Sequence, residues 1–142
     1  MKVKQISIFL ENKPGHLNKV CSQIADAGIN ILTLSLADTQ QFGILRLIVE
    51  DWEKAKDILE EEGSVVKTTD VIAAEVVDEP GGLVEILNII DQGDINIEYM
   101  YAFTCRKGKK AVMVFRFDDP DAAIELLQKE GKNILGAVEL MQ

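Results

Sequence analysis

The residues of this chain best suited to chemistry lie in two short segments that repeat each other. Residues 12–17 read Asn-Lys-Pro-Gly-His-Leu, and residues 78–83 read Asp-Glu-Pro-Gly-Gly-Leu. Asn30 follows Pro14 by 16 positions, and Asn96 follows Pro80 by the same distance. An internal repeat of this kind indicates one small module that occurs twice. We call residues 12–17 loop one and residues 78–83 loop two.

Each loop precedes an apolar helical pattern, so each is expected to form the start of a helix. Pro14 suits the first helical position, because proline lacks the N–H group that would be unpaired there. We expect the N–H groups of Gly15, His16 and Leu17 to stay unpaired at this helix end. Free donors and the positive end of the helix dipole favour a carboxylate.

Glycine and asparagine complete this chemistry. Gly15 and Gly81 allow a ligand to come close to the backbone. The side chains of Asn30 and Asn96 can accept a hydrogen bond from an ammonium group and donate one to a carboxylate. An α-amino acid carries both groups, so the sequence indicates binding of such a zwitterion.

The two loops differ in charge. Loop one has the neutral Asn12 and the cationic Lys13, whereas loop two has Asp78 and Glu79. Two acids beside a helix N-terminus satisfy its donors and repel a ligand carboxylate. We predict that loop one holds its ligand more tightly, unless Asp78 binds the ammonium group instead.

Apolar periodicity predicts the elements that position these loops. The first copy is predicted to have a half-buried strand at residues 3–10, a helix at 14–28, a hairpin of strands 30–37 and 43–50, a helix at 52–63, and a short strand that opens at 65. The second copy repeats this order, with a strand at residues 71–77, a helix at 83–90, a hairpin of strands 95–105 and 110–117, a helix at 119–131, and a strand at 133–140. The offset between copies is 66 residues at first and 68 after the second, longer hairpin.

Each copy therefore has β-α-β-β-α-β order, which predicts an α+β fold. We expect two ferredoxin-like modules, residues 1–69 and 70–142, each an antiparallel sheet with helices on one face. Modules this small bury little surface alone, so the copies are expected to pack side by side. The other face of strands 43–50 and 110–117 is also apolar. A strand with two apolar faces is usually covered on both, here either by loops of the same chain or by a second copy in a face-to-face homodimer.

Composition narrows the classes of partner. The 142 residues carry a net charge of -9, which argues against nucleic acid as a partner. The one basic cluster, Arg106, Lys107, Lys109 and Lys110, is interpreted as a solvated hairpin tip. No apolar run approaches the length of a membrane span, and no signal peptide is recognised, so a cytoplasmic protein is expected. Cys21 and Cys105 lack metal-ligand or redox spacing, and we expect neither a metal nor a cofactor.

The duplicated strand, Asn/Asp-x-Pro-Gly-x-Leu, helix and Asn-Ile pattern resembles the ACT domain, a family of amino-acid-sensing regulatory modules. The resemblance covers almost the whole chain and implies a stand-alone tandem ACT protein. It also implies a ligand site between two modules, where the loop of one meets the second strand of the other. The implied ligand-binding residues are Asn12, Lys13, Gly15, His16, Leu17 and Asn96 for loop one, and Asp78, Gly81, Gly82, Leu83 and Asn30 for loop two.

The sequence allows two functions to be compared with that of an amino-acid sensor. An enzyme is disfavoured, because the one histidine, His16, cannot support a histidine-based metal site and no phosphate loop or nucleophile elbow occurs. His16 by itself reads as an exposed loop residue. The alternative is an interaction subunit that binds an amino-acid metabolic enzyme and no metabolite, which an apolar second sheet face fits equally well.

Overall fold

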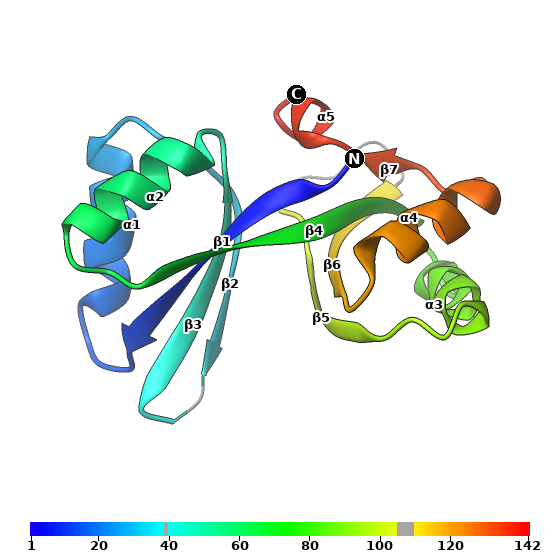
Figure 1. Cartoon of the computed structure of the whole chain (residues 1–142), viewed down its shortest axis with the longest axis horizontal. Coiled ribbons are helices and arrows are strands. Elements are labelled where there is room, and N and C mark those ends of the chain that lie inside the picture. The colour runs from blue at the N-terminus through cyan, green and yellow to red at the C-terminus, as the bar shows by residue number, and fades with distance from the viewer. Residues whose placement is uncertain (39, 105–109) are drawn as a thin grey trace. The chain divides into compact units, whose positions relative to one another are not determined.

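A computed structural model describes residues 1–38, 40–104 and 110–142 of the chain (Figure 1). Contacts divide it into two compact units, which we call the first unit, Lys4–Thr69, and the second unit, Met1–Val3 with Asp70–Gln142. Both have the predicted βαββαβ order, so the α+β fold is confirmed. The expectations for Cys105 and for Arg106, Lys107 and Lys109 fall outside the described residues.

The first unit is an antiparallel sheet with two helices on one face (Figure 1). Its elements are β1 (Val3–Glu11), α1 (His16–Asp26), β2 (Ile31–Asp38), β3 (Phe42–Val49), α2 (Trp52–Glu61) and the start of β4 (Val66–Val77). The strand order is β2-β3-β1-β4. Ile6 pairs with Leu47 and Ile8 with Leu45, and all four side chains are fully buried in the core that faces the helices. The alternation of β1 and β3 thus produces the core directly.

The second unit repeats this plan. Its elements are the rest of β4, α3 (Gly82–Gln92), β5 (Ile97–Ala102), β6 (Lys110–Phe117), α4 (Pro120–Lys129), β7 (Ile134–Leu135) and α5 (Ala137–Leu140). The strand order is β4-β6-β5, and β7 pairs with β4. Phe115 and Phe117 stack with ring centroids 5.4 Å apart in its core.

The strand β4 differs from the sequence prediction. We expected a short strand opening at Val65, a link, and a separate strand at 71–77, but residues 66–77 form one continuous strand of 12 residues. The segment contains no glycine or proline, and its valine, threonine and isoleucine residues all favour extended backbone. Nothing in the local sequence interrupts the strand, so residues 66–69 lie in the first unit and 70–77 in the second.

The C-terminal segment is also different. The predicted strand 133–140 is wrong, because only Ile134–Leu135 is a strand and the helix α5 follows. The Gly136 N–H donates to a carboxylate oxygen of Glu139 at 2.8 Å, which caps the helix. Leu140 then lies buried. A glycine followed three residues later by a glutamate is a helix-start signal that the apolar alternation concealed.

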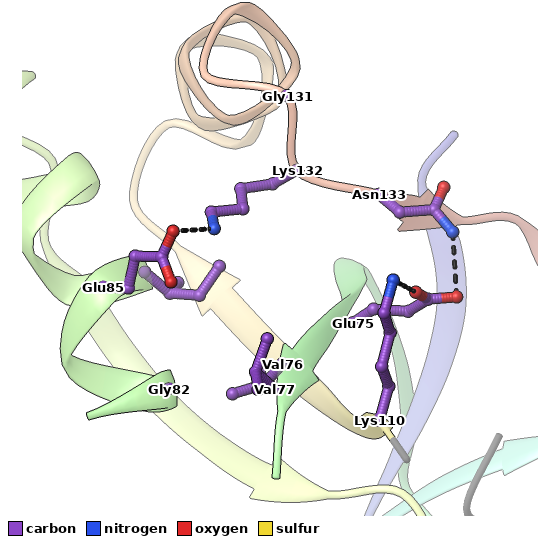
Figure 2. A pocket seen from close by; sticks show the side chains of 10 residues that line it. Glu75, Val76, Val77, Gly82, Glu85, Lys110, Gly131, Lys132 and Asn133 are labelled. Atoms are coloured by element: carbon purple, nitrogen blue, oxygen red, sulfur yellow. Dashed lines mark hydrogen bonds and ion pairs between the residues drawn. The ribbon is translucent and has the colours of Figure 1, made fainter. Parts of the chain in front are cut away.

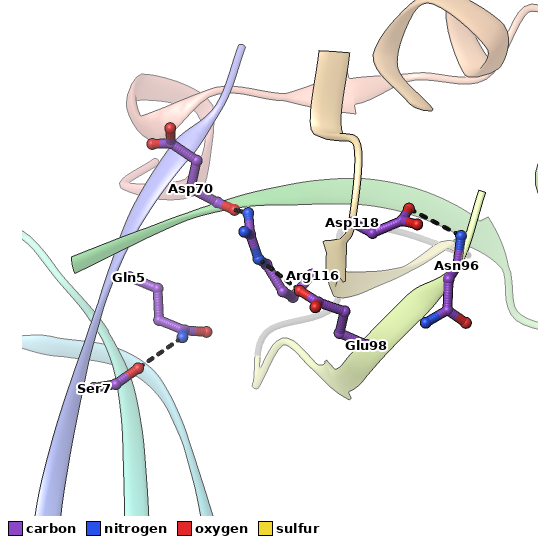
Figure 3. A network of polar contacts seen from close by, with 7 residues as sticks. All are labelled: Gln5, Ser7, Asp70, Asn96, Glu98, Arg116 and Asp118. Carbon is purple, nitrogen blue, oxygen red and sulfur yellow. Dashed lines mark hydrogen bonds and ion pairs between the residues drawn. The ribbon is translucent and has the colours of Figure 1, made fainter. Parts of the chain in front are cut away.

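The face of β1 away from the helices is buried at Gln5 and Ser7 but 43% exposed at Phe9, so the predicted half-buried strand is exposed on this face only toward its end. Gln5 and Ser7 are 0% and 8% exposed, and the Gln5 amide donates to the Ser7 hydroxyl at 3.1 Å (Figure 3). On β6 the face away from the helices is buried too, at Val112 and Val114. The second apolar face that the pattern predicted is therefore present in the folded chain.

Candidate functional site

Loop one and loop two have the same backbone. Gly15 and Gly81, at φ +90° and +87°, adopt the left-handed conformation directly before α1 and α3. The prediction that Pro14 occupies the first helical position is wrong, because α1 begins at His16. In each copy a tight turn after the strand places proline one residue before this glycine, and glycine alone adopts that φ without strain.

The helix donors are partly occupied by the chain. The His16 N–H donates to the Lys13 carbonyl at 3.4 Å, and the Gly82 N–H donates to the Glu79 carbonyl at 3.0 Å. The expectation that His16 offers a free N–H is therefore wrong. Among the described residues, the N–H groups of Gly15 and Leu17 have no partner. Loop one thus keeps two donors available for an anion.

The side chain of Asn12 anchors loop one to the β2–β3 turn. Its amide nitrogen donates to the Asp38 carboxylate at 3.2 Å and to the Gln40 carbonyl at 2.9 Å. The Asp38 carboxylate also accepts from the Gln40 N–H at 2.8 Å. Both amide hydrogens of Asn12 are used, so its carbonyl oxygen is what this side chain offers a ligand.

A cavity lies beside each loop. The loop-one cavity, of about 80 Å³, is lined by Leu10, Glu11, Asn12, Lys13, Leu17, Leu36, Ala37, Asp38 and Gly43. The loop-two cavity, of about 470 Å³, is lined by Val76, Val77, Asp78, Glu79, Pro80, Leu83, Ala111 and Met113, of which all but Pro80 and Met113 are equivalent to residues of the loop-one cavity. Both cavities have apolar walls and polar groups at the loop, the general composition of small-molecule sites.

The two cavities differ in their charges. In loop one the Lys13 ammonium lies 3.1 Å from the Glu11 carboxylate, and this ion pair lowers the pKa of Glu11. In loop two Val77 replaces Glu11 and Glu79 replaces Lys13. Glu79 forms no ion pair with any residue that the structure describes. The loop-one cavity thus has one basic and two acidic side chains, Lys13 with Glu11 and Asp38, whereas the loop-two cavity has the acids Asp78 and Glu79 and no basic residue in its lining.

Asn30 and Asn96 lie directly before β2 and β5, as expected. The Asn96 N–H donates to the Asp118 carboxylate at 3.0 Å, and the Asn96 carbonyl accepts from the Asp118 N–H at 3.1 Å (Figure 3). The Asn30 carbonyl likewise accepts from the Glu50 N–H at 3.2 Å. Neither side-chain amide has a partner within the described ranges.

Each asparagine lies far from the loop of its own unit. Loop one contacts the end of β2 through Asn12, whereas Asn30 precedes its start. Eight strand residues separate the two ends, about 25 Å at the usual rise per residue. One unit therefore cannot bring its own loop and asparagine to the same small ligand.

The comparisons with known proteins agree with this duplicated plan. The family model for an ACT domain pair matches residues 1–142. The chain belongs to the ACT domain family. No curated protein matches it.

Solved structures similar to this ACT domain pair include protein BT0572 from Bacteroides thetaiotaomicron, which is 38% identical with a TM-score of 0.92 over 99% of this chain and 96% of that one. The ligand-free regulatory subunit of aspartate kinase from Thermus thermophilus is 16% identical, with a TM-score of 0.66 over 89% and 91%. The corresponding subunit from Thermus flavus is 17% identical, with a TM-score of 0.62 over 89% and 90%. The last two show a common fold.

Two predicted site residues of the ACT domain pair lie elsewhere. His16 lines a separate cavity behind α1 with Lys19 and Gln23. Gly82 lines the equivalent cavity behind α3, where a Cβ atom would lie 1.9 Å from the Val77 carbonyl oxygen. Gly82 is therefore required for close packing of α3 against β4.

Sequence reasoning missed the cavity residues that come from the strands. Leu36, Ala37 and Asp38 end β2, and Met113 lies on β6. Strand register places these residues beside a loop that is distant in the sequence, and no local sequence motif indicates that register. Within the described chain no helix is long and apolar enough to span a membrane. No group of three or more metal-ligating side chains occurs there either.

Proposed function

We propose that this ACT domain pair is a non-catalytic, cytoplasmic regulatory protein that binds an α-amino acid at loop one. The observation that carries the proposal is the pair of N–H groups of Gly15 and Leu17, which have no partner among the described residues, together with the loop-one cavity that Leu17 lines. A Cβ atom on Gly15 would meet no atom within 4 Å, so a ligand carboxylate has room to reach these donors.

The other lining residues suit the rest of an amino acid. The ammonium group is proposed to bind the Asn12 carbonyl oxygen and the Asp38 carboxylate, which lie at the same end of the cavity. Leu10, Leu17 and Leu36 supply an apolar wall for the side chain. With about 80 Å³ available, a small side chain is favoured over an aromatic one.

We propose that a second ACT module completes each site. Since a unit cannot bring its own loop and asparagine together, Asn96 is assigned to loop one and Asn30 to loop two. The second module can belong to the same chain or to a second copy in a homodimer. Gly81 and Leu83 would serve loop two as Gly15 and Leu17 serve loop one, with weaker affinity because of Asp78 and Glu79.

The partner that reads the bound state is proposed to be an amino-acid metabolic enzyme. The similar Thermus chains are regulatory subunits of aspartate kinase, and they share the fold of this chain. Nucleic acid is disfavoured as a partner by the net charge of -9.

A second candidate is an interaction subunit that binds an enzyme without any metabolite. The observation in its favour is the pair Leu34 and Leu36, which lie on one face of the edge strand β2 and are 43% and 50% exposed. Neighbouring exposed apolar side chains of this kind are typical of a protein contact.

Thermal unfolding of the full chain with each common α-amino acid tests the proposal. A specific ligand raises the midpoint by mass action, by an amount equal to about 2.7 kcal/mol at a hundredfold excess over Kd. Titration calorimetry of Asp38→Asn and of Asp78→Asn then separates the loops. We expect at least a tenfold loss of affinity for the first and less than a twofold loss for the second.

The outcomes divide the alternatives. Equal losses in the two variants would overturn the preference for loop one. No midpoint shift with any amino acid would overturn the sensor and favour the interaction subunit.

A further inference from the structure

The cavities behind α1 and α3 occupy the same place in the two copies. The α1 cavity, of about 230 Å³, lies between β1, α1 and the segment before β4, and its lining includes Phe9, His16, Lys19, Val20, Gln23, Glu62 and Ser64. The α3 cavity, of about 120 Å³, is lined by the residues that the repeat offset predicts, among them Glu75, Gly82, Glu85, Ile86 and Lys132. The pair allows one copy to be compared with the other position by position.

The charged groups that line the α3 cavity are paired with one another (Figure 2). The Lys132 ammonium pairs with the Glu85 carboxylate. The Glu75 carboxylate accepts from the Asn133 amide at 2.8 Å and lies 3.2 Å from the Lys110 ammonium. Its charged groups have found partners within the second unit, so no ligand is needed to satisfy them.

The α1 cavity lacks the equivalent of the Lys132–Glu85 ion pair because the residues at these positions differ. Lys19 occupies the position of Glu85, and Ser64 occupies that of Lys132, so the ion pair cannot form. The Lys19 ammonium has no hydrogen bond or ion pair among the described residues, and neither does the Glu62 carboxylate. Lys19 and Glu62 therefore line the α1 cavity as opposite charges without a partner among the described residues, beside Glu11, which pairs with Lys13.

Gln23 adds a buried polar group to this cavity. It occupies the position of the apolar Ile89, which belongs to the core of the second unit. The side-chain oxygen Oε1 of Gln23 is buried without a hydrogen-bond partner in the part of the chain that the structure describes. A buried acceptor left unpaired is costly, so a donor from outside the chain is favoured here.

We propose that the α1 cavity is a second small-molecule site, for a zwitterion of the α-amino acid class. The ligand carboxylate binds Lys19 and His16, and its ammonium group donates to Gln23 Oε1 and faces Glu62. Phe9, Leu10 and Val20 provide the apolar wall. This site shares the lining residues Leu10 and Glu11 with the loop-one cavity, but its polar binding groups, Lys19, His16, Gln23 and Glu62, are different ones, and the proposal does not rest on the loop-one site.

NMR titration of the full chain tests the proposal. The probes are the common α-amino acids, and the reporters are the side-chain NH₂ signals of Gln23. We expect these signals to shift and saturate with at least one amino acid. Lys19→Met should weaken that response at least tenfold, whereas the control Lys129→Met, which removes an equal charge from the second unit, should leave it unchanged.

A second variant keeps the test independent of loop one. In Asp38→Asn the Gln23 response should persist, and in Gln23→Leu the loop-one response should persist while binding at the α1 cavity is lost. Gln23→Leu restores the apolar character seen at Ile89, so it should fold at least as well as the natural chain. Gln23 signals that no amino acid moves, or equal affinity of the natural chain and Lys19→Met, would overturn the second site.

Discussion

The two copies of the ACT module share a backbone and differ in how they use charge. The turns before α1 and α3 have the same left-handed glycine and the same hydrogen bonds, but the side chains on them differ. In the second unit the charged groups that line the cavity behind α3 form ion pairs, whereas in the first unit Lys19, Glu62 and Gln23 Oε1 have no partner among the described residues. Backbone features thus maintain the fold in both copies, and the unmatched polar groups of the first are the candidates for binding.

The largest expected difference between the copies concerns Gly82 and its equivalent, His16. A Cβ atom at Gly82 would lie 1.9 Å from the Val77 carbonyl oxygen, so Gly82→Ala must displace α3 from β4. We expect a loss of about 2–4 kcal/mol in the free energy of unfolding, measured by urea denaturation. His16→Ala, at the same place in the first unit, should change it by less than about 0.5 kcal/mol. A harmless Gly82→Ala would contradict the packing role.

The next effect should be equal in the two copies. Gly15→Ala and Gly81→Ala each force an alanine into the left-handed region, at φ +90° and +87°, with free space around the new methyl group. Each should cost about 1–2 kcal/mol in thermal or urea unfolding. Gly28 at φ +74° is the control, because its equivalent Asp94 adopts φ +52° with a side chain. Gly28→Asn should therefore cost clearly less than either change.

Helix capping provides a smaller, matched pair. The Asp51 carboxylate accepts from the Lys54 N–H at 3.2 Å, and the Asp119 carboxylate accepts from the Ala122 N–H at 3.1 Å. Asp51→Ala and Asp119→Ala should each lower stability by about 1 kcal/mol in calorimetry. Since the caps are equivalent, a twofold difference between them would show that the units do not rely on the same backbone features.

The smallest effect is confined to loop one and depends on pH. Lys13 lowers the pKa of Glu11 below its ordinary value of 4.5. The ion pair therefore stabilises the folded chain above that value, and its contribution disappears as the pH falls through the lowered pKa. The melting temperature of Glu11→Gln should be slightly below that of the natural chain at pH 7 and equal to it at strongly acidic pH. Loop two has Val77 at this position, so Val77→Ala should show no such pH-dependent difference.

The order and type of most elements followed from the sequence because each has a local cause. The hairpins follow from apolar, β-branched runs around polar turns, and α4 begins at Pro120 because Asp119 caps it. The two errors in the elements have different causes. Residues 66–77 form one strand because nothing in their sequence interrupts extended backbone, and residues 137–140 form a short helix whose apolar pattern is also compatible with a strand.

The candidate site was predictable only in its loops. The repeat of Pro-Gly marked both turns, and the positions of Asn30 and Asn96 before their strands followed from spacing. The His16 N–H is occupied because of the turn geometry around Lys13, and no pattern of residue types specifies that geometry. The unpaired Gln23 could be recognised only when the repeat was aligned on the structure and an amide was found where the other copy has Ile89.

The continuous strand β4 has a consequence for anyone who tries to obtain one module alone. A cut after Thr69 falls inside hydrogen-bonded extended backbone, and a fragment starting at Asp70 lacks Met1–Val3, which belong to the second unit. Such a fragment would lose the buried Val3 and the ion pair between Lys2 and Asp121. Dissection of this tandem by expressing its halves is therefore expected to yield incomplete, aggregation-prone pieces, and point variants in the intact chain are the sounder way to assign a property to either copy.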